Sequence, residues 1–491
     1  MRVPSELYRP SLALATDLYQ LTMAYGYWKT GTAEREAVFQ ALFRANPFGG
    51  GFSVACGLEN LLDWIAAFRF DDEDVSFLAT LRGADEQPLF AQGFLDFLRS
   101  LRLKVDLDAV PEGTVVFPQE PLVRVQGPIL HCQLLETALL NTLNFQTLIA
   151  TKAARIKLAA RGAPVLEFGM RRAQGLDGAL SAARAAYVGG VDGTSNALAG
   201  RLFGIPVRGT HAHSWVMLFG DEREAFESWA EAMPNNCVFL VDTYDTLGGI
   251  DHAITAGHSL RARGHELLGV RLDSGDLAFL SQQARLRLDA AGFPDARVYA
   301  SNDLDEHLIS SLIEQGAAIG VYGVGTRLVT AFDEPALGGV YKLTAVRGPS
   351  GAFEHRVKVS EQALKTTTPG ILQVRRYFEG ETFLADGIWD ELSGCPEGEV
   401  TLVDPLDPTR RKVLPRGTVH QDLLVPVLRG GAPVYESPPL SAMRARTAEQ
   451  LLRLHPGIKR FANPHQYPVG LERSLFELKT RLVLKARGVT A

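Results

Sequence analysis

The chain has 491 residues and a formal net charge of −6 at pH 7; 46% of its residues are hydrophobic and 22% are charged. This length predicts more than one domain, and the composition is that of an ordinary globular protein with ample material for a core. The negative net charge argues against general nucleic-acid binding, which needs a basic surface, but it allows a local basic pocket for a phosphorylated small molecule.

The cysteines and the apolar runs indicate the compartment of the protein. No CxxC pair occurs, so a disulfide framework or a zinc knuckle is disfavoured, and we expect buried thiols in a reducing cytoplasm. The four cysteines are Cys56, Cys132, Cys237 and Cys395. No apolar run approaches the roughly 20 residues of a membrane span, and residues 1–10 lack the apolar core of a signal peptide.

Residues 12–28 are apolar and aromatic with polar interruptions, and they predict the first helix. Thr16 or Asp17 can cap its start. Tyr19 would then share a face with the residues four and eight positions further on. On spacing alone, a buried aromatic stripe is the favoured interpretation of that face.

The next part of the chain alternates between helical and strand-like patterns. Residues 58–68 and 90–101 have helical periodicity, whereas 104–125 has short apolar runs broken by prolines and glycines, typical of strands and turns. Residues 133–160 predict a long helix with a cluster of cations near its end, which we interpret as a solvated face or as a complement to the helix dipole. These cations are Lys152, Arg155 and Lys157.

From residue 165 to residue 325 the chain repeats an apolar strand followed by a helix, which predicts a parallel α/β core. The expected strands are residues 164–168, 205–209, 237–241, 268–272, 297–300 and 318–323. The expected helices are residues 177–203, 250–262, 277–291 and 306–315. Right-handed crossovers put every carboxyl end on one side. A barrel, complete or incomplete, is favoured over an open sheet because functional-looking residues follow every strand.

The remaining sequence predicts a second, mostly β part. Residues 338–430 are again strand-like and are expected to pack with the strands of 104–125, and residues 441–454 predict a helix. The expected domains are an N-terminal α+β part of an outer domain (1–127), an α/β barrel with the active site (128–345), and a largely β C-terminal part that packs with the N-terminal part (346–491).

Polar or glycine residues follow all six expected strands. They are Arg171 and Arg172; Thr210, His211, His213 and Ser214; Asp242, Tyr244 and Asp245; Arg271, Asp273 and Asp276; Ser301, Asn302 and Asp303; and Gly323, Gly325 and Thr326. Each aspartate taken alone is more often a helix cap or a turn residue. The convergence of all six groups on one rim is what predicts a site.

The residue types on this rim suit a phosphorylated substrate. The run 323–326, Gly-Val-Gly-Thr, lets backbone N–H groups approach an anion, although a tight turn is the plainer interpretation. Arg271 and Asp273 alternate along a strand and so point the same way. Asp273 and Asp276 can hold ribose hydroxyls or share a Mg²⁺ ion. Arg171 offers a forked donor, and a salt bridge on the rim is an equally good interpretation.

The histidines of this rim, His211 and His213, allow two kinds of chemistry. Zinc is conceivable, but no third ligand with suitable spacing accompanies them. A histidine beside phosphate-binding residues can instead act as an acid or base, or as a nucleophile that accepts a phosphoryl group. A lone histidine would more often be structural, and the pair at this position favours function.

Five separated motifs occur in order between residue 16 and about residue 343. They are Thr16-Asp-Leu-Tyr-Gln-Leu-Thr-Met, Glu167-Phe-Gly-Met-Arg-Arg-Ala-Gln-Gly, Gly209-Thr-His-Ala-His-Ser-Trp, Arg271-Leu-Asp-Ser-Gly-Asp-Leu and Gly323-Val-Gly-Thr. Together they resemble the nicotinate phosphoribosyltransferase family, and we recognise no motif after about residue 345. The resemblance implies an irregular α/β barrel of the type II phosphoribosyltransferases, flanked by a smaller α+β domain built from N- and C-terminal segments.

The resemblance also implies the reaction. Nicotinate and 5-phosphoribosyl 1-diphosphate would give nicotinate mononucleotide and diphosphate, as the entry of nicotinate into NAD salvage. This pentosyl transfer would be of the ATP-dependent, ligase type, with ATP as co-substrate and Mg²⁺ required. A homodimer with sites shared across the interface is expected.

Carried over by motif position, the resemblance assigns roles to single residues. Tyr19 would stack on the pyridine ring from a partner subunit, which overrides the buried-stripe interpretation, and His213 would be phosphorylated by ATP. We assign catalytic roles to His213, Arg271 and Asp273. The residues assigned to substrate binding are Tyr19, Phe168, Gly169, Arg171, Thr210, Ser214, Asp276, Asn302, Gly323, Gly325 and Thr326.

Other readings of the sequence remain open. A relative that uses nicotinamide would want an amide partner in the pocket, and one that uses quinolinate would want more cations. A sugar-phosphate isomerase or aldolase on a barrel would want a catalytic Lys or Glu at a strand end. Lys342, expected just past the last strand, is the candidate for that role. A catalytically silent binding protein predicts broken motifs, and these are intact.

Overall fold

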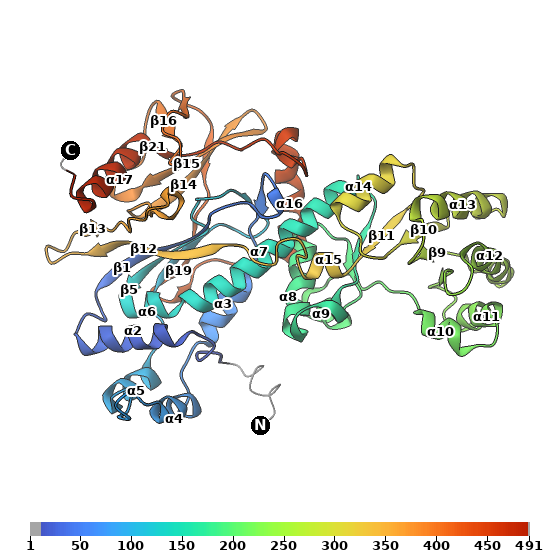
Figure 1. Cartoon of the computed structure of the whole chain (residues 1–491), viewed down its shortest axis with the longest axis horizontal. Helices are drawn as coiled ribbons and strands as arrows, with labels where there is room; N and C mark the ends of the chain where they lie inside the picture. Colours follow the sequence, from blue (N-terminus) through green and yellow to red (C-terminus); the bar gives the residue numbers. More distant parts are fainter. Residues whose placement is uncertain (1–10, 490–491) are drawn as a thin grey trace. The chain divides into compact units, whose positions relative to one another are not determined.

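The computed structural model describes residues 11–489 and divides into two compact units. Of the described residues, the first unit comprises 11–147, 336–439 and 449–489, and the second comprises 148–335 and 440–448. Each unit has its own sheets and helices, shown in Figure 1. Among residues 11–489, a search for a helix that is long and apolar enough to cross a membrane finds none.

A six-stranded parallel sheet forms the centre of the second unit, with the strand order β7-β6-β11-β10-β9-β8. The strands are β6 (Val165–Glu167), β7 (Gly193–Thr194), β8 (Val238–Leu240), β9 (Gly269–Leu272), β10 (Arg297–Ala300) and β11 (Val321–Val324). This order is the chain order run around a circle, so the strands follow the path of an α/β barrel. No ladder within the described chain joins β7 to β8, and the barrel is therefore irregular, as predicted.

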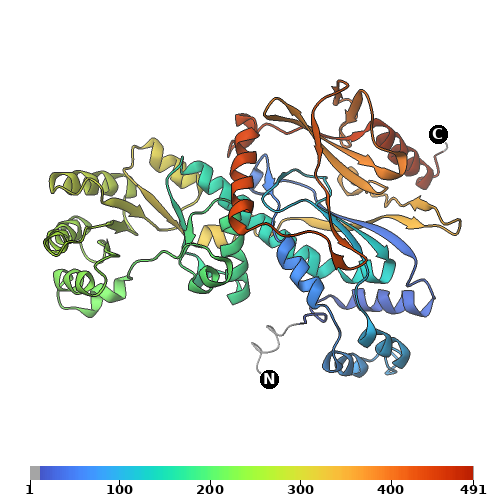
Figure 2. The same ribbon diagram turned by 180° about the vertical axis from the view of Figure 1, so that it is seen from behind.

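Helices connect these strands and cover the sheet. They are α7 (Glu136–Ala159), which begins in the first unit, α8 (Gly175–Val188), α9 (Ala197–Phe203), α10 (His213–Leu218), α11 (Glu222–Ala232), α12 (Thr246–Ala262), α13 (Leu277–Ala290), α14 (Glu306–Glu314) and α15 (Thr326–Val329). Helices α11, α12 and α13 lie side by side in Figures 1 and 2. Asp245, Asp276 and Asp305 cap α12, α13 and α14, because their carboxylates accept backbone N–H groups of the first turn.

Two sequence predictions in this unit were wrong. The expected strand 205–209 is only an isolated parallel bridge between Thr194 and Val207. The expected helix 177–203 ends at Val188, and the chain forms β7 before α9 begins. A glycine pair ends the helix, since Gly190 has a φ of +114°, a conformation that side chains other than glycine rarely adopt.

The first unit contains an antiparallel sheet of order β13-β12-β1-β5-β3-β19-β20. Its strands are β1 (Glu36–Phe43), β3 (Asp106–Ala109), β5 (Val123–Pro128), β12 (Gly339–Arg347), β13 (Phe353–His355), β19 (Val425–Arg429) and β20 (Ala432–Pro433). Strands distant in sequence pair here, β1 with β12 and β3 with β19. In Figure 2 the blue ribbon of β1 lies beside the yellow to orange ribbon of β12. A short pair, β2 (Ser53–Val54) and β4 (Val115–Val116), stands apart.

Helices accompany this sheet in the first unit. They are α2 (Leu18–Lys29), α3 (Leu58–Ala67), α4 (Asp72–Thr80), α5 (Gln92–Ser100) and α6 (Ile129–Leu134). Asp17 precedes α2, but its side chain does not cap the helix; its Oδ2 accepts from Thr137 Oγ1 at 3.0 Å. The cap expected at this position is therefore absent, because the carboxylate is engaged by another helix.

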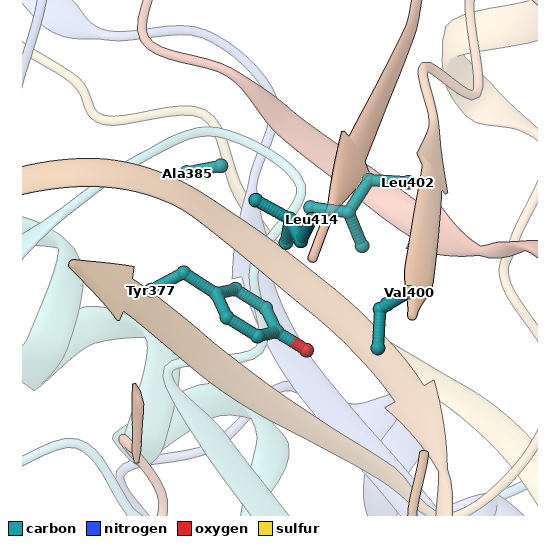
Figure 3. Packing of buried hydrophobic residues seen from close by; sticks show 5 residues of the cluster. All are labelled: Tyr377, Ala385, Val400, Leu402 and Leu414. Atoms are coloured by element: carbon teal, nitrogen blue, oxygen red, sulfur yellow. The ribbon is translucent and has the colours of Figure 1, made fainter. Parts of the chain in front are cut away.

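The C-terminal third adds a second sheet to the first unit, of order β17-β16-β21-β15-β14-β18. Its strands are β14 (Leu372–Glu379), β15 (Thr382–Asp390), β16 (Val400–Val403), β17 (Arg411–Leu414), β18 (His420–Asp422) and β21 (Val469–Glu472). Helix α17 (Arg473–Ala486) packs on β16 and β21, and α16 (Leu440–Arg453) is the helix expected at 441–454. Figure 3 shows the buried cluster of this sheet, formed by Tyr377, Ala385, Val400, Leu402 and Leu414.

The unit boundaries differ from the expected ones at 127/128 and 345/346. Strand β12 pairs along its length with β1, so residues 339–345 belong to the first unit, as do the residues up to 147. Lys342 is thus paired with Gln40 in a sheet of the first unit and does not follow a barrel strand. Cys395 is exposed, which corrects the expectation of four buried thiols.

Candidate active site

The carboxyl end of β9 carries the cation of the site. Arg271 donates through one guanidinium nitrogen to Thr210 Oγ1, while its buried Nε has no hydrogen-bond partner among residues 11–489. Burial lowers the pKa of Arg271, the carboxylates of Asp273 and Asp242 raise it, and Arg171 lowers it. An arginine stays charged under such shifts, so a second guanidinium beside it makes this corner attractive to an anion.

Two carboxylates organise the turn that follows β9. Asp242 Oδ2 accepts from the backbone N–H of Asp273 at 2.8 Å and from Ser274 Oγ at 2.6 Å. Ser301 Oγ donates to Asp273 Oδ1. The other oxygen of Asp242 is buried without a hydrogen-bond partner in the described chain. Hydrogen bonds to Asp242 and Asp273 therefore connect the ends of β8, β9 and β10. One oxygen of this aspartate pair, Asp242 Oδ1, remains able to accept a further hydrogen bond or to bind a cation.

His213 lies at the edge of this carboxylate pair, at the first position of α10. Its Nε2 is 3.8 Å from Asp273 Oδ2, and its Nδ1 is 3.2 Å from Thr243 Oγ1. The side chain is 41% exposed, so reagents from solvent can reach it. An accessible imidazole oriented by a carboxylate and a hydroxyl can act as an acid or base, or as a nucleophile.

His211 is placed differently. It is 5% exposed, and burial lowers its pKa to about 4, so the ring is neutral at physiological pH. Its Nε2 accepts from the backbone N–H of Leu240 at 3.3 Å, and its Nδ1 faces Ala212 O at 3.4 Å. The two contacts fit one tautomer, with the proton on Nδ1. His211 is therefore a structural histidine that attaches the segment after Val207 to β8.

The ends of β6 and β11 form the glycine-rich side of the rim. Glu167 is 1% exposed; its oxygens accept from Gly169 N and, at 2.5 Å, from Thr194 Oγ1, and burial raises its pKa despite these bonds. Phe168 N donates to Val324 O at 2.8 Å. A Cβ at Gly323 would lie 2.7 Å from the Phe168 ring, so glycine is required for the ring to rest there.

The turn after β10 is strained. Asn302 and Asp303 have φ values of +98° and +42°, in the left-handed region that residues other than glycine rarely occupy. Such conformations cluster at functional sites, where the surrounding structure holds them in place. Ser301, which precedes this turn, is the residue bonded to Asp273.

Several predicted residues lie on the same rim but are engaged otherwise or exposed. Asp276 Oδ1 accepts from Ala278 N and Phe279 N, both at 3.1 Å, which is the helix-cap interpretation of that aspartate. Ser214 and Arg171 are exposed, and Gly325 and Thr326 begin the single turn α15. Tyr19 belongs to the first unit and is 48% exposed, so the buried-stripe interpretation of Tyr19 was wrong.

Some residues of the site had no role assigned from the sequence. Asp242 and Ser301 were noted as strand-end residues and Glu167 as the start of a motif, but neither these nor Thr243 and Thr194 had a role assigned. The position of Asp242 directly after an apolar strand was a signal that could have found it. The other four contribute hydrogen bonds between strands, and single-sequence patterns do not reveal such bonds.

Residues 11–489 contain no group of three or more His, Cys, Asp or Glu residues that could hold a metal ion by themselves. A Mg²⁺ site that depends on substrate phosphates needs only one or two carboxylates. Asp273 and the unpartnered oxygen of Asp242 fit that smaller requirement.

Family models and curated relatives match this chain along most of its length. Family models match at residues 14–144 (nicotinate phosphoribosyltransferase N-terminal domain), 164–358 (nicotinate phosphoribosyltransferase family) and 373–479 (nicotinate phosphoribosyltransferase C-terminal domain). The nicotinate phosphoribosyltransferase of Bacillus subtilis (strain 168) is 42% identical over 478 residues, which is 96% of this chain and 95% of that protein. That of Bos taurus is 36% identical over 540 residues, with 97% of each covered.

Solved structures of related proteins also match this chain along most of its length. The crystal structure of human nicotinic acid phosphoribosyltransferase superposes with a TM-score of 0.82 at 34% identity, covering 95% of this chain and 99% of that one. A nicotinate-nucleotide pyrophosphorylase from Pyrococcus furiosus, 22% identical, shares the fold with a TM-score of 0.66, covering 90% of this chain and 95% of that one. The match at residues 373–479 extends into the part where no motif was recognised in the sequence.

Proposed function

Because the chain belongs to the nicotinate phosphoribosyltransferase family, it transfers a phosphoribosyl group to nicotinate in NAD salvage, and we propose that it couples this transfer to ATP through His213. The substrates are nicotinate and 5-phosphoribosyl 1-diphosphate, and the products are nicotinate mononucleotide and diphosphate. The observation that supports the coupling is the accessible imidazole of His213 beside Asp273, on the rim that also carries Arg271.

The chemistry of the transfer needs little from a protein base. The bond between the anomeric carbon and the diphosphate oxygen breaks, positive charge develops on the sugar, and the pyridine nitrogen forms the new bond. That nitrogen carries no proton to remove, so positioning and electrostatics are the main tasks of the site. Arg271 and Arg171 would attract the anionic groups, and the backbone at Gly323 and Gly325 would hold the 5′-phosphate.

The coupling step is a phosphoryl transfer to His213. A ring nitrogen would form a bond to the γ-phosphorus of ATP as the bond to the ADP oxygen breaks, and water would later release phosphate from the histidine. A phosphohistidine adds negative charge beside Asp273, which gives the site a second electrostatic state. Mg²⁺, when bound, would neutralise the phosphates, and Asp273 with Asp242 would hold it.

Replacement of His213 tests this proposal. We expect His213→Gln to retain slow formation of nicotinate mononucleotide without ATP and to lose stimulation by ATP. His258→Gln, at an exposed histidine of α12 in the same unit, is the matched control and should keep that stimulation. Full ATP stimulation in His213→Gln would contradict the proposal.

We also propose a homodimer in which Tyr19 completes the site of the partner subunit. Tyr19 and its neighbour Leu18 are 48% and 52% exposed, which leaves an aromatic and an aliphatic side chain free to be covered. Mixing two inactive variants, Tyr19→Ala and Arg271→Ala, tests this. After subunit exchange, shared sites predict recovery of roughly one quarter of the wild-type activity, whereas unshared sites predict none.

The choice of pyridine is tested by product formation with nicotinate, nicotinamide or quinolinate, each with and without ATP. Nicotinate should be the preferred substrate, and its turnover should rise with ATP. A cytoplasmic location is part of the proposal, supported by the absence of a membrane-spanning helix and of disulfides among residues 11–489.

A further inference from the structure

A cavity of about 660 Å³ lies wholly within the first unit and is not used by the proposed reaction. It lies at the β17, β16 and β21 side of the C-terminal sheet, where the loop of residues 404–410 and the segment 464–468 meet the glycine run 49–51. Pockets of about 300–1,000 Å³ are typical of small-molecule sites. The cavity is therefore large enough for a ligand of nucleotide size.

Cations dominate the charged residues that line this cavity. They are Arg44, Arg410, Arg411 and Lys412, and they face one carboxylate, Asp404. Arg410 is 3.8 Å from Asp404 and donates to Gln466 Oε1 at 3.0 Å, so that carboxylate is already paired. Arg411 is exposed, and its Nε donates only to the carbonyl of Pro408. The excess of positive charge favours an anionic ligand.

Lys412 strengthens this preference. Its Nζ donates to Leu384 O at 3.0 Å, and burial lowers its pKa although the carboxylate of Glu379 raises it, so the ammonium group has lost part of its hydration. A partly desolvated cation gains more from an anion than a fully hydrated one does. Arg410 lies two positions before Lys412, where the chain is already extended and paired with Asp404, so the two side chains point the same way, and both line the cavity. Arg411, between them, points to the other face of β17.

The rest of the lining is apolar side chain or glycine backbone, apart from the polar side chains of Asn46, Gln119, His465 and Gln466. Leu402, Leu406 and four prolines form much of the wall, and Leu402 also belongs to the buried cluster of Figure 3. Phe117 and Tyr467 stack with ring centroids 3.9 Å apart. Tyr467 donates to Asp386 Oδ1 at 2.8 Å, and Asp386 is in turn paired with the buried Arg376. A wall fixed in this way is pre-organised for a flat apolar ring.

We propose that this cavity binds a nucleotide, with its base against the proline and leucine wall and its phosphate on Arg410 and Lys412. The site is separate from the rim of the barrel, because all its lining residues belong to the first unit. The proposal concerns binding of a nucleotide at this cavity, and it holds whether or not the proposed ATP-coupled reaction occurs at the barrel.

Calorimetric titration of the full-length protein with AMP tests the proposal. The background is Arg271→Ala, which weakens binding of phosphorylated ligands at the barrel. The pocket variant adds Arg410→Ala and Lys412→Ala, and the control adds Arg99→Ala and Arg102→Ala, which remove the same charge from exposed positions of the same unit. We expect the pocket variant to weaken AMP binding roughly tenfold or more, since each lost charged contact contributes about one decade, and the control to change nothing.

Two further titrations distinguish a nucleotide from inorganic phosphate as the ligand and provide a second pocket variant in case the first does not fold. Inorganic phosphate should bind roughly tenfold or more weakly than AMP, because it cannot use the apolar wall. Leu406→Asp, at a side chain that is 51% exposed, should weaken AMP binding without removing a cation. Absence of AMP binding to the background protein, unchanged affinity in both pocket variants, or phosphate that binds as tightly as AMP would overturn the proposal. Because the readout is binding, the outcome is independent of any failure of ATP coupling.

Discussion

Replacing His211 by phenylalanine should change the pH dependence of folding stability. The ring is buried against Trp229, Phe226 and Phe239, with centroids 5.0, 6.1 and 6.3 Å away, so phenylalanine fits the same aromatic surroundings. It cannot accept the backbone N–H of Leu240, however. Leaving a buried donor unpaired costs about 1–3 kcal/mol, which is the expected loss of unfolding free energy at neutral pH.

The same substitution removes a titratable group that makes the unfolding free energy depend on pH. Burial lowers the pKa of His211 from about 6.5 to about 4. Between these values the unfolded chain binds the proton and the folded protein does not, so the contribution of this group is complete above about pH 6.5 and is lost as the pH falls towards 4. At 1.36 kcal/mol per pKa unit, the wild type should lose about 2 kcal/mol through this group between about pH 7.5 and about pH 5.

Urea unfolding at about pH 7.5 and about pH 5 measures both effects. The gap in unfolding free energy between wild type and His211→Phe should shrink by about 2 kcal/mol at the lower pH, because only the wild type carries the linked term. His265→Gln, at a loop position, is the control and should follow the wild-type profile. A gap that stays constant between the two pH values would show that His211 is not held neutral by the fold and would refute the reasoning.

Three other substitutions test the remaining structure. Glu306→Gln removes the buried carboxylate shared by Lys152 and Arg155, although Lys152 keeps Asp333 at 2.7 Å, and it should lower the unfolding free energy by about 3–5 kcal/mol in urea titration. The wild type should lose the same contribution on acidification below about pH 4, since two adjacent cations outweigh burial and lower the pKa of Glu306. Gly323→Ala places a Cβ 2.7 Å from the Phe168 ring and should raise KM for nicotinate roughly tenfold, seen in steady-state kinetics. Asp242→Asn keeps the shape of the side chain but removes the negative charge that accepts the backbone N–H of Asp273, so kcat/KM should fall roughly ten- to hundredfold. Unchanged kinetics in Gly323→Ala or in Asp242→Asn would contradict the role given to that residue.

The barrel strands could be predicted because they are short, continuous apolar runs. Residues 237–241 and 297–300 were expected, and the strands found are Val238–Leu240 and Arg297–Ala300. A parallel strand buried on both faces needs no polar alternation, so composition alone reveals it. Strand β7 consists of Gly193 and Thr194 and has no such signal; hydrogen bonds to β6, not side-chain pattern, define it.

Charged residues on helices were the least predictable. Lys152 and Arg155 were interpreted as a solvated face, yet both are buried and paired with Glu306 in α14. Their partner lies about 150 residues further along the chain, and a helical spacing pattern contains no information about it. The cost of burying such charges is recovered only when all the partners are present, so the interaction is a property of the folded unit.

The candidate site was predictable in its residue types and not in its hydrogen bonds. Arginine, aspartate and histidine after successive strands indicated a rim, and the structure brings Arg271, Asp273 and His213 to it. That Asp242 holds the backbone of Asp273, and that Ser301 bonds its carboxylate, depends on distances between strands. Sequence order does not set those distances until the strand order around the sheet is known.

The two histidines of the Gly-Thr-His-Ala-His motif show how the open side of the barrel serves the site. In an extended strand, residues two apart share a face, and His211 and His213 would have equal surroundings. The chain instead leaves the sheet after its bridge at Val207 and enters α10 at His213. His211 therefore turns into the aromatic core and bonds β8, while His213 stays at the surface near Asp273. A complete strand here would have closed the barrel with backbone ladders, but it would have denied His213 its accessible position beside the carboxylate.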